Sequence, residues 1–278
     1  MLDFSQQRDL SLHAQVIADV QAVATEIKAP VLVVGAFARD LHLHYGAGLP
    51  IQRGTLDVDI GLGMHSWAEF ERLRTCLIES KKFSPVEDKH HRLRHEHNLF
   101  VDLVPFGDLE TADRKVAWPP NGEVVMSVLG FREALASAEE VLLPLDVSTH
   151  VVSPPSLALL KLIAWDERHH RFPKRDAPDL MMLIRHYMEL GNNQERLWNE
   201  FAFWMDEDFF DVEESGARML GGDIRSLLDE YGAANVIAIL DSQIDESGVG
   251  ELLREMDARS PERARRLLVC MLRGIRGQ

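Results

Sequence analysis

The chain has 278 residues, of which 46% are hydrophobic and 27% are charged, and its formal net charge is −15. This length fits one large domain or two ordinary ones, and the acidic balance argues against a protein that binds nucleic acid with its whole surface, though not against a local basic groove. Its two cysteines are too few for a disulfide scaffold and form no CxxC pair for zinc. No stretch fits a signal peptide or a membrane span, so we expect a soluble cytoplasmic protein with no membrane partner.

The first elements are predicted to be a helix, a strand and a second helix. Apolar residues at helical spacing over residues 10–27 predict the first helix, and the short apolar run over residues 30–34 predicts a buried strand. The strand ends at Gly35, where the missing side chain lets a ligand approach the backbone. A helix over residues 36–45 would direct its free N–H groups to that point. The pattern is the outline of an anion site, but a plain tight turn is the more common explanation of a lone glycine after a strand.

A glycine-containing loop over residues 46–54 leads to a strand that carries two acids. Asp57 and Asp59 alternate with apolar residues, so both side chains point to one face of the strand, roughly 6 to 7 Å apart. Two like charges held close to a core are costly unless a cation lies between them. Carboxylate oxygens suit Mg²⁺, with Mn²⁺ as the alternative ion. The pair therefore predicts a divalent metal site.

A third acid, Asp102, lies inside a later apolar strand. A single Asp in such a strand is more often at an edge or a turn. If the strand lies next to that of Asp57 and Asp59, however, three carboxylates converge as they do in two-metal sites for phosphoryl displacement. The segment 90–97 between them carries four histidines and two arginines. Because the arginines would repel a cation, we interpret this segment as a polar strand with local positive charge and not as a zinc site.

The order of these motifs resembles the nucleotidyltransferase superfamily with the polymerase-β-like core. It is most similar to the AbiEii-type nucleotidyltransferases, the toxin components of type IV toxin–antitoxin systems. The motifs that carry the resemblance are Gly35-Ala36 followed by Arg39, then Arg53-x-Thr55-x-Asp57-x-Asp59, and then Asp102 in the later strand. The second glycine or serine of the usual turn is replaced by Ala36. The resemblance therefore implies backbone N–H contacts to phosphate at this turn and no hydroxyl contact.

The second half begins with a helix that starts near residue 153 and is apolar except for Lys161. Such a lysine either snorkels at the helix surface or is directed at a ligand. After a basic loop, Asp176 stands where it can cap the next helix, and Asp179 lies near the same face. In the AbiEii-type family the lysine contacts nucleotide phosphate and the Asp supports or joins catalysis. The resemblance implies these roles for Lys161 and Asp176, with Asp179 as a second candidate.

These observations predict an α/β (α+β) fold. A nucleotidyltransferase-like mixed sheet with flanking helices would occupy residues 1–152, and a helical C-terminal domain over residues 153–278 would complete the nucleotide cleft. The resemblance implies Mg²⁺-dependent transfer of a nucleoside monophosphate from a nucleoside triphosphate (NTP) to an acceptor hydroxyl. Asp57 and Asp59 would hold the metal, and Asp102 would help to deprotonate the acceptor.

The acceptor and the partners are open at the level of the sequence. A toxin-type enzyme would act on RNA and would be paired with an antitoxin protein. The net acidity favours a small-molecule acceptor, as in the aminoglycoside nucleotidyltransferases. The last predicted helix, residues 261–275, carries arginines that either contact a nucleic-acid backbone or simply suit the helix dipole. A catalytically silent nucleotide- or partner-binding module is a further alternative, because Ala36 departs from the family pattern.

Overall fold

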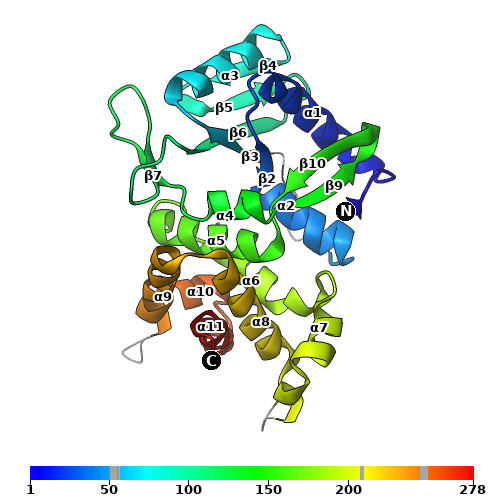
Figure 1. The fold of residues 1–278 in the computed structure, drawn as a ribbon, viewed down its shortest axis with the longest axis vertical. Helices are drawn as coiled ribbons and strands as arrows, with labels where there is room; N and C mark the ends of the chain where they lie inside the picture. The colour runs from blue at the N-terminus through cyan, green and yellow to red at the C-terminus, as the bar shows by residue number, and fades with distance from the viewer. Residues whose placement is uncertain (51–54, 56, 207–209, 245–249) are drawn as a thin grey trace. The chain divides into compact units, whose positions relative to one another are not determined.

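The structure is a computed structural model that describes residues 1–50, 55, 57–206, 210–244 and 250–278 (Figure 1). The chain divides into two compact units. The first comprises Met1–Leu41 and Ile51–Ser153, and the second comprises His42–Pro50 and Pro154–Gln278. Within the described residues, no helix combines the length and the apolar character needed to span a membrane.

The first unit is built on an eight-stranded mixed sheet. Its strands are β1 (Leu2–Asp3), β2 (Val31–Val34), β3 (Asp57–Met64), β4 (Phe83–Val86), β5 (Lys89–His95), β6 (Phe100–Gly107), β9 (Glu139–Leu143) and β10 (Val147–Val151). They lie in the order β1-β9-β10-β2-β3-β6-β5-β4. A separate hairpin pairs β7 (Lys115–Ala117) with β8 (Val125–Ser127). The mixed sheet that the sequence predicts is confirmed.

Among the described residues, the α-helices of this unit are α1 (Ser11–Glu26), α2 (Gly35–Asp40), α3 (Trp67–Glu79) and α4 (Phe131–Ala136). The predicted helix over residues 36–45 is α2 followed directly by a π-helical turn, Leu41–Gly46. Ser66 caps α3, since its hydroxyl accepts a hydrogen bond from the Glu69 backbone N–H at 3.2 Å. The order helix, strand, helix, acidic strand is therefore the order that the hydrophobic pattern predicts.

Strand β3 places its acids on the face opposite its core residues. Its alternating apolar side chains, Val58, Ile60, Leu62 and Met64, are at most 2% exposed. Asp57 and Asp59 alternate with them and are half-buried. Because β3 is central, with β2 antiparallel on one side and β6 parallel on the other, its register is fixed along both edges.

The second unit is helical over its longer segment. Its helices are α5 (Pro154–Arg168), α6 (Ala177–Arg185), α7 (Asn193–Glu200), α8 (Val212–Leu227), α9 (Glu230–Ile244), α10 (Glu251–Met256) and α11 (Pro261–Arg276). Buried leucine and methionine side chains on α8 and α11 form much of its core, among them Leu220, Leu267, Leu268 and Met271. The segment His42–Pro50 also belongs to this unit. The predicted domain boundary at residue 152 would instead place this segment in the first unit.

Candidate active site

Three carboxylates share one face of two adjacent parallel strands. Asp59 on β3 is in register with Asp102 on β6, and Asp57 lies two residues before Asp59 on the same face. Asp102 is 8% exposed and lies inside β6, which pairs with β3 on one side and β5 on the other, so it is not an edge or turn residue. The expectation that the two strands are neighbours is confirmed. The sheet thus gathers the three acids that the sequence singled out.

Arg92 joins these acids from the next strand. It lies on β5 in register with Asp102, and its Nε and Nη2 donate to Asp102 Oδ1 and Oδ2 at 2.6 and 2.5 Å. Nη2 also donates to Asp57 Oδ2 at 3.2 Å. The guanidinium lies 5.2 Å from the ring centroid of Phe100. The hydrogen bond to Asp102 raises the pKa of Arg92 above its ordinary value, so Arg92 remains a cation.

Among the described residues, this face carries more negative than positive charge. Asp57, Asp59 and Asp102 contribute three carboxylates, and Arg92 contributes one guanidinium. His91 Nε2 lies 4.0 Å from Asp102 Oδ1, but burial lowers the pKa of His91, which keeps its ring neutral at pH 7. A divalent cation would neutralise the excess, and carboxylate oxygens are the donors that Mg²⁺ and Mn²⁺ prefer. The residues present therefore fit a divalent ion.

Gly35 is required where the backbone passes Asp59. Its φ angle is +73°, a conformation that glycine adopts without strain. A Cβ atom at this position would lie 1.9 Å from Asp59 Oδ2. The carboxylate thus lies directly against the Gly35 main chain. The close neighbour of this turn is a side chain of the protein itself, and the approach of a ligand stays a prediction.

The other predicted residues of the first half differ in what they contact. Thr55 Oγ1 exchanges hydrogen bonds with the backbone of Asp57 at 3.2 Å and so fixes the start of β3. Arg39 is buried, and its Nε and Nη2 donate to Asp40 Oδ1 at 3.0 and 2.7 Å. Ala36 is half-buried in α2. Arg53 lies outside the described residues.

A second cluster, within the second unit, contains the predicted lysine. Lys161 Nζ lies 3.3 Å from Asp176 Oδ1 and 2.7 Å from Asp179 Oδ2. Arg168 Nε and Nη2 donate to the two oxygens of Asp176, both at 2.8 Å. Lys161, Asp176 and Asp179 are each at most 7% exposed. The snorkelling interpretation of Lys161 is therefore wrong, because its ammonium is buried and paired.

Asp176 also differs from its expected capping role. It occupies the position before α6, but its side chain makes no capping hydrogen bond. It binds the two cations instead. Burial alone would raise the pKa of Asp176, but the hydrogen bond from Arg168 and the charge of Lys161 outweigh burial and hold the pKa below its ordinary value. Asp176 is thus an ionised acid inside an ion-pair network.

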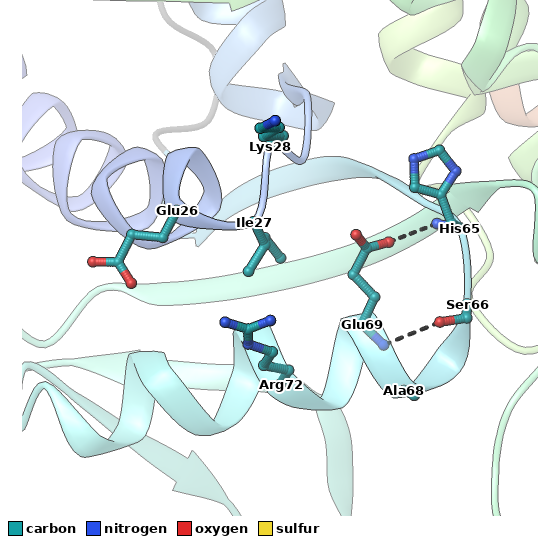
Figure 2. A pocket seen from close by; sticks show the side chains of 8 residues that line it. All are labelled: Glu26, Ile27, Lys28, His65, Ser66, Ala68, Glu69 and Arg72. Atoms are coloured by element: carbon teal, nitrogen blue, oxygen red, sulfur yellow. Dashed lines mark hydrogen bonds between the residues drawn. The ribbon is translucent and has the colours of Figure 1, made fainter.

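A pocket of about 510 Å³ in the first unit lies away from the acids (Figure 2). It is lined by the end of α1 with the turn that follows, and by the junction of β3 with α3. Figure 2 shows how two of its polar groups are used: Glu69 Oε2 accepts from the His65 backbone N–H at 2.7 Å, and the Ser66 hydroxyl accepts from the Glu69 N–H. This is helix-capping geometry. None of the predicted site residues lines this pocket.

Comparison with known proteins gave one family match and a set of structural neighbours. The family described as "Nucleotidyl transferase AbiEii toxin, Type IV TA system" matches residues 21–236, a range that contains all the predicted site residues. A solution structure of the antibiotic-resistance factor ANT(2'')-Ia is 13% identical, with a TM-score of 0.40 and coverage of 70% of this chain and 96% of that chain. A crystal structure of ANT(2'')-Ia with adenylyl-2''-tobramycin is 13% identical, with a TM-score of 0.39 and coverage of 62% and 88%. A search of curated proteins found no match.

Proposed function

The chain belongs to the AbiEii family of nucleotidyltransferase toxins of type IV toxin–antitoxin systems, and we propose that it transfers a nucleoside monophosphate from an NTP to an acceptor hydroxyl, with release of pyrophosphate and with the help of Mg²⁺. The observation that carries the metal dependence is the register of β3 with β6. That register places Asp57, Asp59 and Asp102 on one face, and the guanidinium of Arg92 binds two of them, Asp57 and Asp102. Mn²⁺ is the alternative ion.

Asp57 and Asp59 would hold the divalent ion, with Asp102 as the third carboxylate. When bound, the ion would supply charge neutralisation and polarisation of the phosphoryl group. Asp102 would accept the proton of the acceptor hydroxyl. Its oxygens already accept from Arg92, but an ionised carboxylate has about four lone-pair sites, so two acceptor sites are left. Arg92 would keep the carboxylates in place, since catalysis of this kind depends on positioning and on preorganised charge.

Lys161 would contact nucleotide phosphate, as the family resemblance implies. Its ammonium has three donors, of which two are directed at Asp176 and Asp179. Asp176 would act by orienting Lys161 and Arg168, and Asp179 by fixing Lys161. Gly35 and Ala36 would offer backbone N–H groups to phosphate. The Arg39 guanidinium would contact phosphate only after it is released from Asp40.

RNA is the acceptor that a toxin-type enzyme would use, with an antitoxin protein as partner. A small-molecule acceptor is the second candidate, and the charge distribution favours it. The chain carries a net charge of −15. In addition, two arginines of α11 form ion pairs with acids of the protein. Arg263 pairs with Asp211 and Arg276 with Asp241, both at 2.8 Å. These two side chains do not form a basic surface for a phosphate backbone.

Calorimetric titration of each of the four NTPs, with and without Mg²⁺, tests the site. We expect Mg²⁺-dependent binding of at least one NTP to the wild type, and loss of that binding in Asp57→Ala/Asp59→Ala. Asp113→Ala is the matched control, because Asp113 is an exposed acid of the same unit. Metal-independent binding, or binding retained in the double variant, contradicts the assignment of these acids.

Transfer of labelled nucleotide to bulk tRNA or to aminoglycosides identifies the acceptor. Label on tRNA supports the toxin-type enzyme, and label on an aminoglycoside supports the small-molecule enzyme. NTP binding without transfer to either acceptor favours the silent module. In each assay, the double variant of Asp57 and Asp59 supplies the background.

A further inference from the structure

Two adjacent histidines and one glutamate come together at the meeting point of two helices in the second unit. His169 and His170 directly follow the end of α5, and Glu251 is the first residue of α10. One ligand atom from each residue lies within 4.8 Å of the others. The ion pairs of the carboxylate site and of the Lys161 cluster do not include any of these three side chains. Their position therefore needs its own explanation.

His169 is held in a defined orientation and tautomer. Its ring is stacked on Trp165, with centroids 4.2 Å apart and planes inclined by 14°. Its Nδ1 lies 2.8 Å from the Trp165 carbonyl oxygen. A carbonyl oxygen only accepts hydrogen bonds, so Nδ1 carries the proton, and in the neutral ring Nε2 carries the lone pair. A backbone acceptor on the far nitrogen is the usual support of a metal-binding histidine.

The free side of the ring faces a carboxylate at a distance that suits a shared ion. His169 Nε2 lies 3.6 Å from Glu251 Oε2, which is beyond a normal hydrogen bond. Two ligands at about 2.1 Å from a tetrahedral Zn²⁺ are about 3.4 Å apart. His170 completes the set, with its ring centroid 3.7 Å from that of His169. His170 and Glu251 are exposed, so an ion can enter from solvent.

The helix end and a nearby carboxylate favour a cation, against the positive charges of Arg171, Lys174 and Arg175 in the segment that follows His170. The site lies at the C-terminal end of the 15-residue helix α5, where the helix dipole is negative. Glu255 adds a second carboxylate nearby, since its Oε2 accepts from Trp165 Nε1 at 3.0 Å. The neighbouring cation Arg168 is bound to Asp176. The ligand set therefore carries net negative charge.

We propose that His169, His170 and Glu251 bind a divalent transition-metal ion, with Zn²⁺ as the best match. Two imidazoles and one carboxylate form a three-ligand set that suits zinc and leaves one position for water. The ion links the end of α5 to the start of α10 and so stabilises the second unit. Mg²⁺ is a poor fit because it prefers oxygen ligands.

A second cluster of histidine and acidic side chains shows which contacts argue against a metal site. Asp19, His95 and Glu96 also bring three ligand atoms within 4.8 Å. There, however, Lys82 Nζ lies 2.6 Å from Asp19 Oδ1, and His95 Nε2 lies 3.1 Å from Asp19 Oδ2. The place of a cation is taken by an ammonium group. At His169 no such ion pair with a lysine is found among the residues that the structure covers.

Titration of ZnCl₂ into the full chain, followed by calorimetry, tests the proposal, and Co²⁺ absorption reports the coordination geometry. We expect one ion that binds in both the wild type and the Asp57→Ala/Asp59→Ala background, which removes the carboxylate site. His170→Ala and Glu251→Gln should each weaken this binding at least about 100-fold, because loss of a mere outer-shell partner already costs about 10–100-fold. Both side chains are exposed, so both variants should fold.

His150→Ala is the matched control, since His150 is an exposed histidine of the first unit. The affinity of this variant for Zn²⁺ should equal that of the wild type. Absence of binding at micromolar Zn²⁺ overturns the proposal. Unchanged affinity in His170→Ala and Glu251→Gln also overturns it, and assigns any bound ion to another group such as Asp19, His95 and Glu96. These outcomes are independent of nucleotide transfer.

Discussion

Arg92 and Asp102 form a two-pronged ion pair across adjacent strands, with Nε–Oδ1 and Nη2–Oδ2 distances of 2.6 and 2.5 Å. The two side chains are 16% and 11% exposed, so the pair is largely removed from water. Arg92 also reaches Asp57. The guanidinium is therefore the internal counter-ion of the face on which we propose that a divalent ion binds. Any such ion shares these carboxylates with Arg92.

Replacement of Arg92 should destabilise the protein and strengthen its response to Mg²⁺. Arg92→Gln leaves Asp57 and Asp102 without the guanidinium that binds them, and breaking a buried ion pair costs about 3 kcal/mol. The loss should appear as a lower thermal midpoint in a metal-free buffer. Added Mg²⁺ should raise the midpoint more in Arg92→Gln than in the wild type, because the ion then replaces the missing charge.

Arg94→Gln is the control for this experiment. Arg94 lies on the same strand, but it is exposed and bonds to Asn98. Its replacement should change the midpoint little and leave the Mg²⁺ response at the wild-type level. An equal Mg²⁺ response in Arg92→Gln and the wild type would show that Arg92 and the ion do not share the carboxylates.

Gly35→Ala should disturb the site through Asp59. The new Cβ would lie 1.9 Å from Asp59 Oδ2, so the carboxylate must move. Gly48→Ala is the matched control, because Gly48 has nearly the same φ angle, +72°, but no atom within 4 Å of an added Cβ. Each variant should lose about 1 kcal/mol of stability from backbone strain. Only Gly35→Ala should also lose Mg²⁺-dependent NTP binding in calorimetry. Similar NTP binding by both variants would separate Gly35 from the site.

The sequence predicts the carboxylate face better than it predicts what surrounds it. The alternation around Asp57 and Asp59 fixes their common face, because side chains in a strand alternate with period two. Asp102 joins them through the pairing of β3 with β6. The role of Arg92 depends on the antiparallel register of β5 with β6, which no local pattern encodes. The segment around it was predicted only as locally positive.

In the second unit, too, local sequence patterns do not predict contacts between distant segments. Helical spacing predicts that Asp176 and Asp179 share a face, and the structure brings both to Lys161. A capping position gives no information on whether the side chain caps, and Asp176 binds the cations of Lys161 and Arg168 instead. The approach of Glu251 to His169 joins distant segments, so it has no signal in a single sequence.

Lys161→Met should be strongly destabilising, because it leaves Asp179 buried without its cation. Removal of one partner of a buried ion pair costs about 3–5 kcal/mol. The double variant Lys161→Met/Asp179→Leu should lose less than the sum of the two single variants, by about 1–3 kcal/mol, because the buried charge is then removed as well. Unfolding in urea measures all three. Lys115→Met is the control, since its pair with Asp113 is exposed and should contribute about 0–1 kcal/mol. Strict additivity would mean that Lys161 and Asp179 are not coupled.

Lowering the pH should remove the contribution of Asp176 to the stability of the folded protein. Its pKa is lower in the folded protein than in the unfolded chain, so the unfolded chain takes up the proton more readily. The ionised carboxylate therefore stabilises the fold fully above the unfolded pKa of about 4, and this stabilisation disappears as the pH falls through the lowered folded pKa. In urea unfolding, the difference between the wild type and Asp176→Asn should be constant from about pH 7 to pH 5 and should shrink below about pH 4. Asp166→Asn, an exposed change on α5, should match the wild type throughout. A difference for Asp176→Asn that persists unchanged at about pH 3 would show that Asp176 acts through packing and not through its charge.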